Sequence, residues 1–113
     1  MTKVEAEQLL AESRKQIDAI DLQLRELFNR RTKIVEDVLR AKDALHMPVY
    51  EASREEAVLN RITDGNPGPL DDASFRRVFG TLMQVMREFQ MARREQQHPH
   101  AAPSDDPTSE TFE

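Results

Sequence analysis

Residues 10–45 read LAESRKQIDAIDLQLRELFNRRTKIVEDVLRAKDAL, and this stretch decides the fold. Its apolar residues recur at heptad spacing in two interleaved sets, which is the pattern of a helix with one apolar seam. The two sets are Leu10, Ile17, Leu24, Val38 and Leu45, and Ile20, Leu27, Ile34 and Ala41. Neither Gly nor Pro interrupts residues 6–45, and Pro48 follows. The pattern predicts one helix of about 38 residues that ends before Pro48.

A shorter helix is predicted after Pro48. It begins at the capping-box pattern of residues 53–56, or slightly earlier at Tyr50 or Glu51. Its inward-facing residues are expected to be Ala57, Val58 and Ile62. The segment DGNPGP, residues 64–69, ends this helix because Gly, Pro, Asn and Asp favour turns.

A third helix is predicted to begin at Asp71 or Asp72 and to end near Gln96 or Gln97. Its apolar residues at helical spacing are Phe75, Val78, Phe79, Leu82, Val85, Met86 and Phe89. The expected fold class is therefore all-α, with three helices in each chain and one of them very long.

The composition supports this class. One third of the residues are charged, 38% are hydrophobic, and the chain has no Cys, no Trp and three Gly. Such a profile is typical of a soluble helical protein and excludes a disulfide framework or a Cys zinc site. No apolar run approaches the length of a membrane span, and the first residues, MTKVEAEQLL, lack the order of a signal peptide. We therefore expect a cytoplasmic protein that does not bind membranes.

The last residues differ from the rest. Residues 1–97 are predicted to form the helical domain, and residues 98–113, HPHAAPSDDPTSETFE, to form a disordered acidic tail. Four acids and no Lys or Arg in this tail account for most of the net charge of −5, so the helical domain is close to neutral. A neutral domain with an acidic tail is a poor candidate for binding nucleic acid. His98 and His100 lack further ligands nearby, so no metal site is expected.

The long helix predicts an assembly. At about 1.5 Å per residue it spans roughly 57 Å, whereas a compact globule of about 100 residues has a radius of gyration of about 13 Å. Two shorter helices cannot cover both halves of such a seam. A second copy of the chain is the natural cover, and we expect a helical homodimer.

Two cations on the long helix are candidates for binding a small anion. Arg31 occupies a seam position, where a buried arginine is costly unless it meets an anion. Lys42 lies about 20° away in azimuth and about 16 Å along the axis, so the two cations share one face. Arg31 could instead pair with an acid or fix the register of the helices. Lys42 could instead compensate the helix dipole.

Two further polar residues enter the candidate site. Arg14 lies about 42 Å from Lys42 along a straight helix, but in an antiparallel pair that crosses near Phe28 it faces Lys42 of the other chain. This geometry would give two composite sites in each dimer. Gln90 falls within the apolar stripe of the third helix and either donates to a ligand, or is a satisfied core amide or a frayed helix end.

In its order of motifs the chain resembles the all-helical class of chorismate mutase (type II, AroQ-like), across roughly residues 8 to 92. The segments that carry the resemblance are SRKQIDAIDLQLRELFNRR (13–31), the VLRAKD end of the long helix, MPVYEASREEAVLNRI, and FRRVFGTLMQVMREFQ (75–90). The family consists of intertwined three-helix homodimers, which convert chorismate to prephenate in phenylalanine and tyrosine biosynthesis without a cofactor.

The resemblance also implies roles for individual residues. Arg14 from the partner chain, Arg31 and Arg54 would hold the two substrate carboxylates. Lys42 and Gln90 would donate to the ether oxygen. Glu55, helped by the backbone around Glu51, would accept from the substrate hydroxyl. Glu51 stands where aspartate is frequent in the family. Met86 stands at a substrate-binding position where some members have serine, and it brings no hydroxyl donor.

Other functions remain open from the sequence. The same scaffold could serve an isochorismate pyruvate lyase or a mutase of 4-amino-4-deoxychorismate. A helical dimer that only binds is an alternative of a different class. It would be favoured if the charged side chains paired with one another.

Overall fold

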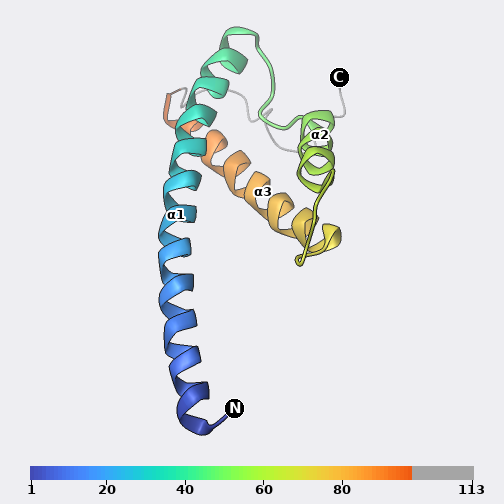
Figure 1. Cartoon of the computed structure of the whole chain (residues 1–113). Helices are drawn as coiled ribbons and strands as arrows, with labels where there is room; N and C mark the ends of the chain where they lie inside the picture. The colour runs from blue at the N-terminus through green and yellow to red at the C-terminus, as the bar shows by residue number, and fades with distance from the viewer. Residues whose placement is uncertain (98–113) are drawn as a thin grey trace. The chain divides into compact units, whose positions relative to one another are not determined.

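Three α-helices make up the part of the chain that the structure, a computed structural model, describes, which is residues 1–97 (Figure 1). They are α1 (Lys3–Ala44), α2 (Ala52–Thr63) and α3 (Asp72–Gln97), and residues 1–97 contain no strand. The prediction of an all-α chain with one very long helix is confirmed. The expected disordered tail and the two histidines of residues 98–100 lie outside the described residues.

Helix α1 has 42 residues, and local hydrogen bonds set both of its ends. At the start, the Glu5 backbone N–H donates to the Thr2 hydroxyl at 3.1 Å, and the Thr2 N–H donates to the Glu5 carboxylate at 2.8 Å. This is a capping box, which satisfies two helix N–H groups reciprocally. At the end, His46 takes a positive φ of 57°, and the Met47 N–H donates to the Lys42 carbonyl at 2.8 Å. The helix therefore ends in a Schellman motif shortly before Pro48.

Helix α2 begins one residue before the predicted capping box. Its N-cap is Glu51, in an extended conformation, and the Glu51 side chain makes no capping hydrogen bond. Ser53 lies inside the first turn, so its role as the cap was predicted wrongly, whereas the earlier start near Glu51 is confirmed. The capping box does not form, since the carboxylate of Glu56, which would have to reach back to Ser53, pairs with Arg76 of α3 at 3.2 Å.

Helix α3 begins and ends where the sequence predicts. The Asp71 carboxylate accepts a hydrogen bond from the Ser74 backbone N–H at 2.8 Å, which caps the first turn. The Ser74 hydroxyl and then the Ser74 backbone N–H lower the pKa of Asp71 below its ordinary value of 3.8. Both interactions favour the charged form of the carboxyl group. The helix ends at Gln97.

The chain falls into two compact units, Met1–Ile34 and the residues from Val35 onward, and α1 continues from the first into the second. In the second unit, α2 packs against α3. Ion pairs join α1 to α3, between Arg93 and Glu36 at 3.1 Å and between Arg94 and Asp43 at 2.7 Å.

Few side chains are buried within residues 1–97. Four are apolar and two are polar: Leu39, Val49, Met83 and Met86, with Lys42 and Gln90. Val58 and Ile62 of α2 are half-buried as predicted, but Ala57 is exposed. Ala57 faces solvent because the half-buried residues of α2 share one face of the helix, and at about 100° per residue Ala57 lies on nearly the opposite face.

The predicted seam of α1 is exposed within one chain. Its eight large apolar side chains have exposed fractions between 42% and 67%. They are Leu10, Ile17, Ile20, Leu24, Leu27, Ile34, Val38 and Leu45. None of the three helices in residues 1–97 combines the length and the apolar character that crossing a membrane requires.

Candidate active site

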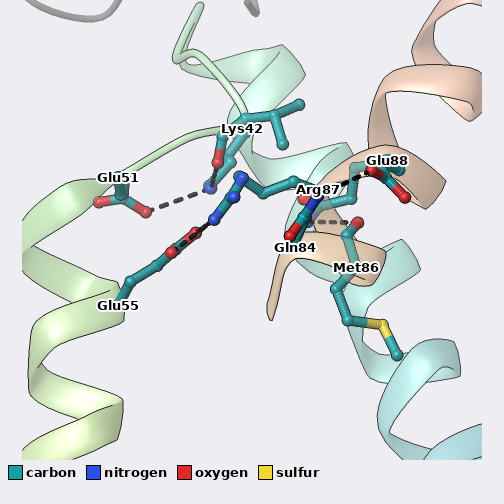
Figure 2. Close-up of polar contacts among 9 residues, drawn as sticks. Lys42, Glu51, Glu55, Gln84, Met86, Arg87 and Glu88 are labelled. Atoms are coloured by element: carbon teal, nitrogen blue, oxygen red, sulfur yellow. Dashed lines mark hydrogen bonds and ion pairs between the residues drawn. The ribbon is translucent and has the colours of Figure 1, made fainter. Parts of the chain in front are cut away.

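Lys42 is the centre of the candidate site. It lies in the last turn of α1, and only 8% of its surface is exposed. Its Nζ donates to the Val49 backbone carbonyl at 2.6 Å and lies 3.3 Å from a carboxylate oxygen of Glu51 (Figure 2). A buried ammonium requires such partners because its hydration is lost. Lys42 therefore holds the segment between α1 and α2 against the end of α1.

Glu51 serves two parts of the structure. Its backbone begins α2 as the N-cap, and its carboxylate pairs with Lys42. An N-cap carboxylate usually accepts from the first N–H groups of its own helix. Here the carboxylate pairs with the buried ammonium of Lys42 instead, because an ammonium that has lost its hydration requires an anionic partner.

Glu55 lies one turn into α2, on the same face as Glu51. Nη1 of Arg87, from α3, donates to both carboxylate oxygens of Glu55 at 2.5 Å each. The exposed fractions of the two side chains are 19% for Arg87 and 22% for Glu55. The Arg87 guanidinium also lies 5.0 Å from the centre of the Tyr50 ring, within range of a cation–π contact. Glu55 is thus held in place from across the helix pair.

Gln90 and Met86 lie in the core of the second unit. Gln90 is 7% exposed, and its Nε2 donates to the Met86 backbone carbonyl at 3.2 Å. Its Oε1 is buried and has no hydrogen-bond partner among residues 1–97. In Figure 2 the Met86 side chain points away from Lys42, Glu51 and Glu55. An amide nitrogen carries two N–H groups, so one donor of Gln90 remains after the bond to Met86.

The structure brings some of the predicted site residues together. In Figure 2 the side chains of Lys42, Glu51, Glu55 and Arg87 point toward one another, from three helices and the segment that joins the first two. Arg54 is exposed on α2 next to Glu55. The exposed Arg14 and the half-buried Arg31 belong to the first unit, Met1–Ile34.

Sequence reasoning missed Arg87 and Tyr50. Arg87 precedes Gln90 by three residues, so the two side chains share a face of α3. The sequence signal that could have identified Arg87 is a cation three residues before the amide of Gln90. It was weak, because arginines at the edge of an apolar stripe are common and usually reach solvent.

This arrangement can bind a small anionic ligand through hydrogen bonds and charge. A buried ammonium and a buried amide can both donate hydrogen bonds, and an ordered carboxylate can accept one. Within residues 1–97, no three His, Asp or Glu side chains lie close enough to hold a metal ion. The chemistry available here is the orientation of a ligand and the stabilisation of negative charge on it.

Comparison with known proteins identifies relatives. The chain matches the family described as chorismate mutase type II over residues 13–91. It is 39% identical over 77 residues to a bifunctional chorismate mutase/prephenate dehydratase of Neisseria gonorrhoeae, which covers 68% of this chain and 21% of that protein. It is 38% identical over 53 residues to a chorismate mutase of Methanocaldococcus jannaschii, which covers 47% of this chain and 54% of that protein. The chain spans about a fifth of the length of the bifunctional relatives.

A solved structure extends the likeness to the fold. Chorismate mutase (Form II) from Thermus thermophilus superposes with a TM-score of 0.69 at 27% identity, over 72% of this chain and 92% of that one. The family match spans most of the described helices, from within α1 to within α3, and it includes every site residue discussed above. With its three-helix fold and its match over residues 13–91, the chain belongs to the type II chorismate mutase family.

Proposed function

We propose that this protein is a chorismate mutase that converts chorismate to prephenate. The reaction is an intramolecular rearrangement in which one C–O bond breaks as one C–C bond forms, and it requires no nucleophile from the protein. Catalysis consists of holding the reactive conformer and stabilising negative charge that develops on the ether oxygen. Family membership and the names of the relatives support this proposal.

The observation that carries the proposal is the buried ammonium of Lys42. An ammonium has three N–H donors, and Val49 and Glu51 account for two of them. We assign the third to the ether oxygen of the substrate. Because Lys42 is only 8% exposed, water screens its charge weakly, and its interaction with a developing negative charge is correspondingly strong. The remaining N–H of Gln90 serves as a neutral second donor.

The acceptor and the carboxylate groups complete the proposed site. Glu55 accepts a hydrogen bond from the substrate hydroxyl, and the backbone near Glu51 assists it. Arg31 and Arg54 hold the substrate carboxylates, since the planar guanidinium fork fits a carboxylate bidentately. Met86, the remaining residue assigned to substrate binding, brings no hydroxyl donor, and its side chain points away from Lys42 in Figure 2.

A homodimer completes the site with Arg14 from the partner chain. The exposed seam of α1 supports this assembly, because burying its apolar side chains, which are about half exposed in one chain, removes apolar surface from water and so favours association. Eight such residues lie along the seam. A second copy of the same helix presents an apolar stripe of equal length to cover them.

The test is to mix purified protein with chorismate, follow its disappearance, and identify the product. We expect rapid conversion to prephenate. If a folded dimer leaves chorismate intact, the assigned substrate is wrong, and isochorismate and 4-amino-4-deoxychorismate are the next compounds to test. Lys42 pairs with Glu51 and Glu55 pairs with Arg87, which is the pairing that favours a dimer that only binds. Binding of chorismate without turnover would support that alternative.

A further inference from the structure

Arg87 is a half-buried cation of the second unit that the proposed reaction does not use. It reaches Glu55 across 32 positions of sequence, and its Nη1 contacts both carboxylate oxygens. The pair is well shielded, with exposed fractions of 19% and 22%. Water and salt screen the attraction in such a pair less than in a pair at the surface.

The contact leaves Glu55 able to accept another hydrogen bond. Each carboxylate oxygen has two lone-pair sites, and Arg87 occupies one on each oxygen. Glu55 therefore has acceptor capacity remaining for a ligand. Its carboxylate plane is meanwhile fixed by the guanidinium, so the remaining lone pairs point in set directions.

Arg87 also contacts the segment that precedes α2. Its guanidinium lies 5.0 Å from the Tyr50 ring centre, and Tyr50 is the neighbour of both Val49 and Glu51. Those two residues are the partners of Lys42. The corner formed by residues 49–55 is thus held by two cations, Lys42 from α1 and Arg87 from α3 (Figure 2).

We propose that Arg87 is a positioning residue that orients the Glu55 carboxylate toward the hydroxyl of the substrate, acting through Glu55 and touching no reacting atom. This inference rests on the proposed function, because it takes the substrate hydroxyl as the ligand of Glu55. Contacts to that hydroxyl form in the bound substrate and persist in the transition state. Losing them raises KM more than it lowers kcat.

The test is a steady-state kinetic comparison on the full chain with chorismate. Arg87→Met keeps an unbranched stem and removes the charge, and we expect KM to rise at least about tenfold, with a smaller change in kcat. Glu55→Gln should change KM in the same direction. The KM of the Arg87→Met/Glu55→Gln double variant should not exceed the higher KM of the two single variants. The effects of two residues that act as a unit do not add. Arg87→Lys should recover part of the loss as a point charge.

The matched control is Arg76→Met. Arg76 is also an arginine of α3 that pairs with a glutamate of α2, Glu56, at 3.2 Å, but the exposed fractions of this pair are 39% and 59%. We expect its KM and kcat to equal those of the unaltered protein. Helical circular dichroism and Tm are recorded for every variant. If Arg87→Met does not fold, Arg87→Lys carries the test, and an unchanged KM in it overturns the proposal.

The outcomes separate the two proposals. Unaltered protein that does not convert chorismate overturns both. Active protein with normal kinetics in Arg87→Met overturns only the role of Arg87. The same holds if Arg76→Met loses as much as Arg87→Met, or if the effects of Arg87→Met and Glu55→Gln multiply.

Discussion

Lys42 gives the sharpest prediction at the scale of a single residue. Lys42→Ala removes the charge assigned to the ether oxygen, and we expect kcat to fall at least about a hundredfold, equivalent to about 2.7 kcal/mol or more. Single-turnover rates with chorismate measure this effect. The control is Arg40→Ala, which removes an exposed cation of α1 that pairs with Asp37 in the same helix. Near-normal turnover of a folded Lys42→Ala variant would remove Lys42 from the mechanism.

The corner itself depends on Lys42, so a second variant separates catalysis from structure. Lys42→Gln keeps an N–H donor for the Val49 carbonyl but carries no charge. We expect it to retain helical content and Tm better than Lys42→Ala and still to lose turnover. Full activity in Lys42→Gln would mean that a neutral hydrogen bond is sufficient at the ether oxygen.

Gln90 gives a prediction about pH. An amide donates its N–H at every pH, whereas a carboxyl group donates only when it is protonated. In Gln90→Glu we therefore expect the pH–rate profile to move toward acid pH, with low activity at neutral pH. Gln84→Glu is the control, since Gln84 is an exposed residue of the same helix. An unchanged profile in Gln90→Glu would show that Gln90 does not contact the ether oxygen.

At the scale of the element, the cap of α3 gives a prediction about stability. Hydrogen bonds from Ser74 lower the pKa of Asp71 in the folded chain. A carboxyl group whose folded pKa is depressed stabilises the fold above its unfolded pKa, and the contribution is lost as pH falls through the folded value. We expect Asp71→Ala to lower Tm at neutral pH, and the Tm difference from the unaltered protein to shrink as the pH falls below the ordinary pKa of 3.8.

A variant of the same residue checks the origin of this effect. Asp71→Asn keeps an oxygen that can accept from the Ser74 N–H but cannot titrate. The Tm of Asp71→Asn at neutral pH should lie between those of the unaltered protein and Asp71→Ala. The Tm difference between Asp71→Asn and Asp71→Ala should not depend on pH. If Tm differences among the three proteins are constant from neutral to acid pH, the charged form of Asp71 is not what stabilises the cap.

At the scale of the whole molecule, the decisive question is whether two chains share each site. Arg14→Ala and Lys42→Ala are each expected to be inactive alone. In a mixed dimer, one site takes Arg14 from the Lys42→Ala chain and Lys42 from the Arg14→Ala chain, and that site is intact. Refolding the two variants together in equal amounts should restore about one quarter of the activity of the unaltered protein, because dimers form at random and half are mixed.

If refolding together restores nothing while native mass spectrometry shows mixed dimers, Arg14 does not act across the interface. The matched control is the pair Glu55→Gln and Lys42→Ala. Both residues belong to one corner of one chain, so each site of a mixed dimer keeps one of the two changes. Refolding this pair together should therefore create no intact site.

The positions of the helices follow from local sequence patterns. The heptad pattern of residues 10–45 predicts α1, and the acids at positions 71 and 72 predict the start of α3, because these signals act over a few neighbouring residues. The resemblance that arises from the order of motifs agrees with the family match. The sequence left Ser53 and Glu51 both open as the start of α2, and the choice of Glu51 emerges only in the structure, where its carboxylate pairs with Lys42, nine positions away.

How the polar side chains of the site meet depends on contacts between helices, which local patterns do not encode. Arg87 and Glu55 are 32 positions apart, and their contact depends on how α2 packs against α3. Lys42 is bonded to a backbone carbonyl, that of Val49, which no pattern of side chains encodes. Periodicity shows which face of a helix a residue occupies, but the partner opposite that face is set by packing between helices, where burial makes each unpaired charge costly.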